Sequence, residues 1–166
     1  DGRQLILVAT GNSGASPAST DVARYTSTPQ SRSPSRLLAF ALGGTGSVPE
    51  TIVQEFPKPP LPRQPESIAK EGGVYFEAHW CVGCHGYGVV NVRSSIPDLR
   101  LASAQTHAQF AAIVLGGARR DKGMPSFPTL TPGELKALQA YIINEAWAAY
   151  EAQEAAKAQF GKRGTK

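Results

Sequence analysis

Cys81-Val82-Gly83-Cys84-His85 is the stretch that decides how this chain folds and what it carries. The pattern Cys-x-x-Cys-His is the attachment site of a c-type haem. The two thiols add to the two vinyl groups on one edge of the macrocycle, and the histidine directs its imidazole at the iron. The chain contains two cysteines, and both lie in this motif. The sequence therefore predicts one covalently bound haem c, with His85 as an axial ligand of the iron.

Other sites built from a pair of cysteines explain less of the motif. A redox dithiol of the thioredoxin type sits in a βαβ pattern, which this region lacks. A zinc site normally has a second ligand pair at short spacing, whereas His79 and His107 are isolated. A disulfide between Cys81 and Cys84 would close a very small loop and stabilise little. These alternatives stay open at the level of the sequence.

The second axial ligand is predicted in Lys122-Gly123-Met124-Pro125-Ser126-Phe127, which contains the chain's one methionine. The thioether of Met124 favours ferrous iron and raises the reduction potential relative to a second imidazole. The glycine before it lets the backbone approach a haem closely, and the proline after it stiffens the loop. The alternatives are a methionine that only fills the core and His107 as the ligand of a bis-imidazole haem. His79 is expected to be a surface or packing residue.

Composition divides the chain into three regions. Residues 1–44 contain two short apolar runs, Leu5 to Thr10 and Arg36 to Leu42, which are predicted as strands around a polar loop. Prolines recur in residues 45–66 and predict an extended, semi-rigid linker. Residues 67–166 form the predicted cytochrome c domain. Two strands cannot bury a core alone, so residues 1–44 are expected to pair with a partner that a compact cytochrome lacks.

Local signals predict two helices in the last region. Thr131-Pro132-Gly133-Glu134 is a capping box, and the helix that it starts is expected to continue to Phe160. Thr106 is expected to cap a shorter helix that ends at Gly116-Gly117. Aromatic side chains of the last helix are expected to pack on the helix before the haem motif, and these are Tyr141 and Trp147.

The overall composition excludes several classes of protein. The formal net charge of +4 comes from scattered basic residues, whereas nucleic-acid binding calls for a dense basic stripe. No apolar run reaches about eighteen residues, the length that a membrane span requires. A signal peptide and an initiating methionine are also missing, so the chain is expected to be a mature protein or an excised piece.

From about Gly72 to Tyr150 the sequence resembles a class I cytochrome c domain. Such domains have an N-terminal helix, the haem motif, a ligand loop and a C-terminal helix that crosses the first. Their first helix carries a glycine followed four residues later by an aromatic, which Gly72 and Phe76 match. The spacing from that aromatic to the first cysteine is one residue longer than usual, so the pair Gly73 and Tyr75 stays open.

The same resemblance suggests how the haem is held. In this family a proline carbonyl accepts the Nδ1–H of the proximal histidine, and Pro97 in Ile96-Pro97-Asp98-Leu99-Arg100 is the candidate. Such a bond would fix the tautomer of His85 and strengthen it as a ligand; the alternative is an ordinary loop proline. Arg93 and Arg100 are candidates to pair with the haem propionates, because guanidinium groups suit carboxylates. Solvated surface charge is their alternative role.

The order of segments resembles the C-terminal end of a quinohaemoprotein alcohol dehydrogenase. The matching segments are Asp1-Gly2-Arg3-Gln4 before a strand, Ser35-Arg36-Leu37-Leu38-Ala39-Phe40-Ala41-Leu42-Gly43-Gly44, the Pro-rich linker, and the cytochrome with Pro97-Asp98-Leu99-Arg100. In that family an eight-bladed β-propeller binds pyrroloquinoline quinone (PQQ) and calcium and oxidises an alcohol, and a tethered cytochrome takes the electrons. The resemblance implies a mainly α fold of class I cytochrome c type, preceded by the last strands of a propeller.

Only the electron-acceptor role is carried over, because the propeller's catalytic residues, PQQ site and calcium ligands have no counterpart in this chain. The expected function is electron transfer from PQQ to a downstream redox protein or membrane oxidase, without bond-making by the protein. Covalent haem attachment in bacteria happens outside the cytoplasm, which implies the periplasm. One alternative is a free-standing periplasmic cytochrome c, which leaves residues 1–44 unexplained. Another is a gas sensor or peroxidase-type haem protein, which Met124 argues against. The sequence leaves open whether this chain belongs to an enzyme.

Overall fold

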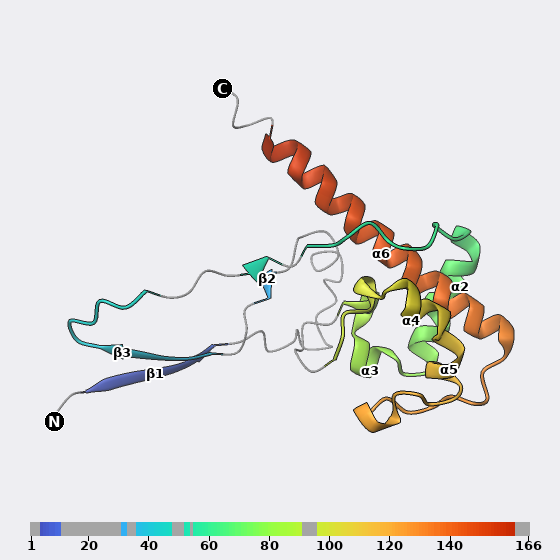
Figure 1. The fold of residues 1–166 in the computed structure, drawn as a ribbon, viewed down its shortest axis with the longest axis horizontal. Coiled ribbons are helices and arrows are strands. Elements are labelled where there is room, and N and C mark those ends of the chain that lie inside the picture. Colours follow the sequence, from blue (N-terminus) through green and yellow to red (C-terminus); the bar gives the residue numbers. More distant parts are fainter. Residues whose placement is uncertain are drawn as a thin grey trace.

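The structure is a computed structural model that describes residues 4–10, 31–32, 36–47, 52–53, 55–90 and 96–161. Helices make up most of the chain after residue 65, and a narrow pair of strands lies away from them (Figure 1). The predicted class, mainly α with a short β segment in front, is confirmed. Most of the loop predicted between the two strands, and Arg93, lie outside the described residues.

Helices α2, Glu66–Ala78, and α6, Pro132–Gly161, cross each other at a glycine. A Cβ atom at Gly72 would overlap the carbonyl oxygen of Ala137 and lie 2.8 Å from Cβ of Tyr141. One turn further along α2, Phe76 is buried and packs on Tyr141, with ring centroids 5.4 Å apart. The pair Gly72 and Phe76 is therefore the crossing pair of the cytochrome c pattern, and the alternative pair is wrong.

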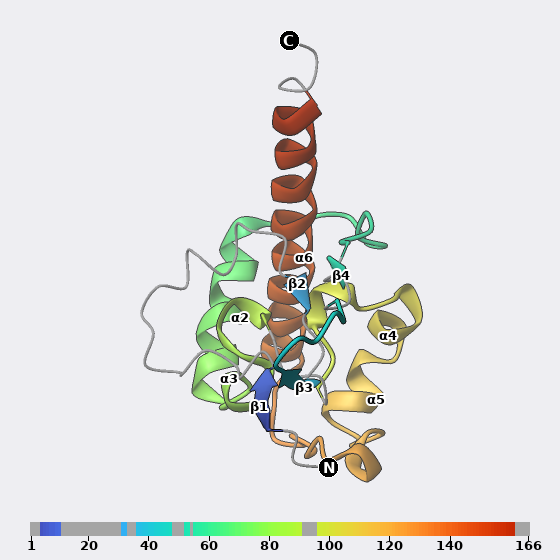
Figure 2. The same ribbon diagram turned by 90° about the vertical axis from the view of Figure 1, so that its left-hand side faces the viewer.

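The start of α6 is fixed by the predicted capping box. Oγ1 of Thr131 accepts the backbone N–H of Glu134 at 3.2 Å, and Oε2 of Glu134 accepts the N–H of Thr131 at 2.8 Å. The helix then runs for 30 residues, a length of about 45 Å at 1.5 Å per residue. Figure 2 shows α6 upright, with α2 and α3 on one side of it and α4 and α5 on the other.

Short helices fill the segment between α2 and α6. They are α3 Val82–His85, η1 Tyr87–Val89, η2 Leu99–Leu101, α4 Ala104–Ala108, α5 Phe110–Val114 and η3 Arg120–Lys122. The predicted cap at Thr106 is wrong, because Ser103 caps α4 and its Oγ accepts the N–H of Thr106 at 3.2 Å. The single helix predicted to end at Gly116-Gly117 is divided at Gln109 into α4 and α5, and α5 ends at Val114, two residues before Gly116.

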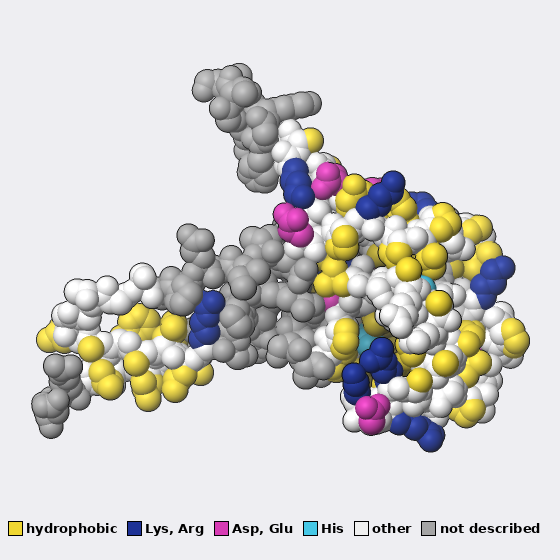
Figure 3. Space-filling model, in the orientation of Figure 1, with side chains coloured by type: hydrophobic (Ala, Val, Ile, Leu, Met, Phe, Trp, Pro, Cys, Tyr) yellow, Lys and Arg dark blue, Asp and Glu magenta, His cyan; other side chains and the backbone are white. Residues whose placement is uncertain are grey.

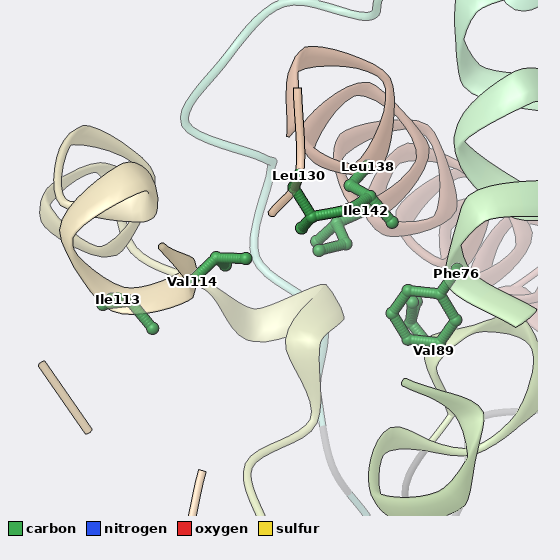
Figure 4. Close-up of a cluster of buried hydrophobic side chains, with 7 residues drawn as sticks. All are labelled: Phe76, Val89, Ile113, Val114, Leu130, Leu138 and Ile142. Carbon is green, nitrogen blue, oxygen red and sulfur yellow. The ribbon is translucent and has the colours of Figure 1, made fainter. Parts of the chain in front are cut away.

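The core lies where these elements meet α6. Seven buried side chains form it, and they come from α2, η1, α5, α6 and the residue before the capping box (Figure 4): Phe76, Val89, Ile113, Val114, Leu130, Leu138 and Ile142. Half-buried residues pack around this cluster, and Cys81, Val82 and Met124 are among them. The haem motif and the predicted ligand loop therefore border the same core.

Both predicted strands exist, and they pair with each other. Strand β1, Leu5–Thr10, runs antiparallel to β3, Arg36–Ala41, from Leu5 opposite Ala41 to Thr10 opposite Arg36. A second, very short pair joins β2, Ser31–Arg32, to β4, Ile52–Val53. Successive strand residues face opposite sides, yet Ile6 and Leu7 are 66% and 60% exposed. Apolar side chains are therefore exposed on both faces of the β1–β3 pair, and Figure 3 shows those on the face toward the viewer.

The segment before α2 runs across α6 (Figure 1). Residues 55–65 belong to the predicted Pro-rich linker, yet Trp147 of α6 donates its indole N–H to the carbonyl of Leu61 at 2.9 Å. Tyr141 packs on α2 as predicted, whereas Trp147 binds this preceding segment instead. The domain boundaries stay a prediction. In the described part of the chain, no helix is both long and apolar enough to cross a bilayer.

Candidate haem site

The Cys-x-x-Cys-His motif forms a single turn directly after α2. The N–H of Cys81 donates to the carbonyl of Phe76 at 3.0 Å, which ties the first cysteine to the end of α2. The N–H of His85 then donates to the carbonyl of Cys81 at 2.9 Å, and Gly86 ends the turn at a φ of 73°. One turn of helix therefore presents both thiols and the imidazole together.

The two cysteines differ in their surroundings. Cys81 is half-buried against the core, whereas Cys84 is exposed, and no disulfide joins them. Burial raises the pKa of the Cys81 thiol, and the neighbouring Cys84 raises it further. The residue before the motif, Trp80, takes a φ of 60° and is exposed. This left-handed backbone conformation, uncommon for a bulky side chain, lets the chain turn from α2 into the motif.

The surroundings of His85 fit an iron ligand whose Nδ1 donates its proton to a nearby acceptor. Its ring lies beside Phe76, with centroids 6.4 Å apart. Burial lowers the pKa of His85, and the backbone of Pro97 acts in the opposite direction. The contact with Pro97 falls short of a hydrogen bond, because the buried Nδ1 has no partner among the described residues. An unpartnered Nδ1 near a carbonyl fits a histidine that would give Nε2 to iron.

Met124 is held by the backbone on both of its sides. Its N–H donates to the carbonyl of Arg119 at 3.2 Å, and Gly123 before it has a φ of 86°. The N–H of Phe127 donates to the carbonyl of Val114 in α5 at 2.8 Å. The side chain of Met124 is half-buried against the core that Cys81 also borders. The loop therefore brings its thioether to the same core that Cys81 borders, while ligation itself stays a prediction.

A side-chain contact that no motif indicated supports the same loop. Nη2 of Arg120 donates to Oγ of Ser126 at 2.7 Å, which joins the two ends of the segment that contains Met124. A basic residue before a predicted ligand loop is usually interpreted as solvated charge. Here the contact shows that Arg120 helps to close the loop.

Arg100 is a buried residue and not a solvated one. Its Nε and Nη2 donate to the two carboxylate oxygens of Asp98 at 3.0 and 2.7 Å, and the two side chains are 2% and 3% exposed. Solvated surface charge, the alternative role for Arg100, is therefore wrong. Pairing of Arg100 with a haem propionate stays a prediction.

The other two histidines are not part of the motif turn, although His79 precedes it and its carbonyl accepts from Sγ of Cys81 at 4.0 Å. His107 is buried on α4, its Nδ1 has no partner in the described part of the chain, and burial lowers its pKa. His79 packs beside Tyr75, and its Nε2 lies 3.5 Å from Oε1 of Glu134, as expected for a packing residue. Across the described ranges, no group of three or more His, Cys, Asp or Glu side chains is placed to hold a metal ion. The zinc alternative therefore lacks its further ligands there.

Comparison with known proteins agrees with this geometry. Residues 68–142 match the family model described as "Cytochrome C oxidase, cbb3-type, subunit III". The chain is 40% identical over 157 residues to lupanine 17-hydroxylase (cytochrome c) of a Pseudomonas species, covering 95% of this chain and 22% of that protein. It is 32% identical over 158 residues to quinohemoprotein alcohol dehydrogenase ADH IIB of Pseudomonas putida, covering 92% of this chain and 22% of that protein.

The chain is a relative of the quinohaemoprotein alcohol dehydrogenases. The solved structure of quinohemoprotein alcohol dehydrogenase ADHIIG from Pseudomonas putida HK5 matches it with a TM-score of 0.62 and 27% identity, over 91% of this chain and 22% of that one. The matched part is a cytochrome c domain, which transfers electrons and whose cofactor is of the haem c class. The chain spans about a fifth of the length of these relatives.

Proposed function

We propose that this chain is the electron-accepting cytochrome c module of a quinohaemoprotein alcohol dehydrogenase. In this proposal it receives electrons from PQQ in a propeller domain and delivers them to a downstream redox protein or membrane oxidase. One observation of the structure carries the proposal. The β1–β3 pair exposes apolar side chains on both faces, as strands do when the layers that pack on those faces are missing. A free-standing carrier would have no use for such strands.

The residues of the chain would hold the cofactor as follows. Cys81 and Cys84 would form the two thioether bonds, and His85 and Met124 would bind the iron. Pro97 would accept the Nδ1–H of His85. When bound, a haem supplies a reversible one-electron couple. The chain itself sets the potential through its soft sulfur ligand and keeps water away from the site with the apolar core that Cys81 and Met124 border.

The domain organisation follows from the same proposal. Residues 1–44 would be the last strands of the propeller, residues 45–66 the connection, and residues 67–166 the cytochrome domain. PQQ and calcium would belong to the propeller, outside this chain, and the periplasm would be the compartment. One named relative is a hydroxylase and another an alcohol dehydrogenase. The proposal therefore fixes the route of the electrons and leaves the donor's substrate open.

The test uses the full chain, exported with c-type maturation, and a PQQ- and calcium-loaded propeller without its cytochrome. The intact mass of the chain should exceed that of the polypeptide by one haem. Adding an alcohol should reduce the haem when the propeller is present, and deleting residues 1–44 should slow this reduction. A mass equal to that of the bare polypeptide contradicts the haem assignment. Equal reduction rates with and without residues 1–44 favour the free-standing carrier.

A further inference from the structure

Two amide side chains of α6 bind the backbone of residues 55–65, here called the strap. Asn144 accepts the N–H of Gln64 at 2.9 Å and donates to its carbonyl at 3.0 Å. Gln153 accepts the N–H of Phe56 at 2.8 Å and donates to its carbonyl at 3.0 Å. Each amide thus satisfies both backbone groups of one strap residue, as a neighbouring strand would.

Further contacts lie between these two positions. Trp147 binds the carbonyl of Leu61, and Nη2 of Arg63 lies 2.7 Å from Oε2 of Glu151 at the surface. The amides themselves are buried, because Asn144 and Gln153 are 7% and 5% exposed. A buried amide is costly to leave without partners. The strap is therefore bound to α6 at both ends and in the middle.

The end of the strap at Phe56 covers the buried ion pair of the Pro97 loop. The guanidinium carbon of Arg100 lies 4.5 Å from the centroid of the Phe56 ring, and Phe56 is itself buried. A guanidinium over an aromatic face is attracted to it, more strongly where water is excluded. Arg100 in turn holds the carboxylate of Asp98 with two hydrogen bonds.

Asp98 connects this arrangement to the predicted proximal ligand. Its Oδ1 also accepts the backbone N–H of Arg100 at 3.1 Å, which fixes the start of η2. The residue before it is Pro97, the predicted acceptor for Nδ1 of His85, which is buried and has no hydrogen-bond partner among the described residues. Direct contacts therefore run from Gln153 through Phe56 and Arg100 to Asp98, and one peptide bond joins Asp98 to Pro97.

We propose that the strap, although it is part of the predicted connection of residues 45–66, packs as part of the cytochrome domain, and that Phe56 is a positioning residue for the proximal side of the haem. Phe56, held by Gln153, keeps Arg100 on Asp98 and thereby positions the loop so that the Pro97 carbonyl would accept the Nδ1–H of His85 in the haem-loaded protein. The proposal rests on the proposed ligation of iron by His85. In this proposal the strap, which follows β3 in the sequence, also supports the loop that positions His85.

The test compares two variants that each remove one amide from the strap of the haem-loaded full chain. Gln153→Ala frees Phe56, whereas Asn144→Ala frees only Gln64 and is the matched control. A weaker Nδ1–H bond makes His85 a poorer donor to ferric iron. Gln153→Ala and Phe56→Ala should therefore raise the reduction potential and speed solvent exchange of the His85 Nδ1–H signal of the ferrous protein severalfold. Phe56→Tyr keeps the aromatic ring, so it should keep the wild-type reduction potential and the wild-type exchange rate of the His85 Nδ1–H.

The outcomes separate this inference from the proposed function. Suppose that Gln153→Ala and Phe56→Ala bind haem and keep the wild-type potential and the wild-type Nδ1–H exchange. The role of Phe56 is then overturned, and the proposed function stays intact. An equal effect of Asn144→Ala and Gln153→Ala would also overturn that role, since the strap would then act only through general stability. Should Phe56→Ala fail to fold, Gln153→Ala and Phe56→Leu carry the comparison. Absence of covalent haem from the wild-type chain would instead contradict the proposed function.

Discussion

Gly72 of α2 and Ala137 of α6 lie so close that no side chain fits between them. A Cβ atom on Gly72 would overlap the carbonyl oxygen of Ala137, and the backbone of a helix cannot turn away as a flexible side chain does. The crossing of the two long helices is therefore set at this point. It also places Phe76, one turn later, between Tyr141 and His85.

Gly72→Ala should destabilise the protein by about 1–3 kcal/mol or more, because overpacking forces the helices apart. Gly73→Ala is the matched control, since its new Cβ would lie 3.4 Å from the Tyr141 ring, and ring atoms are able to shift. Alanine is also the better helix former, by about 1 kcal/mol. Urea unfolding of both variants measures the difference. Equal losses at the two positions would contradict the crossing seen here.

Met124→Ala should open one axial position of the haem and abolish the sulfur-to-iron charge-transfer band of the ferric protein. Added imidazole should then bind to the iron, which the wild type should resist. His107→Ala is the control, because His107 is the rival ligand and lies on α4. Loss of the low-spin spectrum in His107→Ala, with the wild-type spectrum kept in Met124→Ala, would establish a bis-imidazole haem. An open site in the wild type would favour a sensor or peroxidase.

Arg120→Ala should weaken the hold on the methionine loop without removing the ligand. The variant loses the 2.7 Å contact to Ser126, which closes the segment around Met124. The sulfur-to-iron band should therefore disappear at a lower temperature than in the wild type. Lys122→Ala removes an exposed cation from the same short helix and serves as the control. If both variants lose the band at the same temperature, charge rather than the contact is responsible.

Glu134 should make the stability of α6 depend on pH in the acidic range. Hydrogen bonds from the backbone and side chain of Thr131, and then the nearby His79, hold the pKa of Glu134 below its ordinary value. A lowered pKa in the folded state contributes stability above the unfolded pKa of about 4.3, and this is lost as the pH falls through the folded pKa. Melting temperatures measured from neutral pH downward should fall less steeply in Glu134→Gln. Parallel curves for both proteins would contradict this.

The sequence predicted those parts of the fold that depend on contacts between residues close together in the chain. The capping box at Thr131 depends on neighbouring residues and forms as predicted. The helix crossing was open between Gly72 and Gly73, because the choice depends on which one faces α6. The cap of α4 was missed for a related reason: Ser103 and Thr106 are both good caps, three residues apart.

The binding of the strap to α6 could not be predicted from neighbouring residues. Its prolines correctly indicated extended backbone, but its binding depends on Asn144 and Gln153, which are 80 and 97 residues away from the positions they hold. One signal was available in the helix itself. Asn144 directly follows Ile142 and Ile143 on the buried side of α6, and an amide among apolar neighbours needs a partner with both a donor and an acceptor. A backbone segment outside helices and sheets is such a partner, because its N–H and C=O groups are free to bind the amide.

The β1–β3 pair should be the first part of the isolated chain that a protease removes. Two strands are at best marginally stable alone, and the large apolar side chains of this pair are exposed, Ile6 and Leu37 among them. Limited proteolysis should therefore cut within residues 1–44 and leave a haem-containing fragment that begins near the strap. Adding the propeller domain should protect the strands. The double variant Ile6→Thr, Leu37→Thr should reduce aggregation of the isolated chain, keep the haem potential and lose this protection. Strands that resist cleavage in the isolated chain would mean that they belong to this fold and need no further domain.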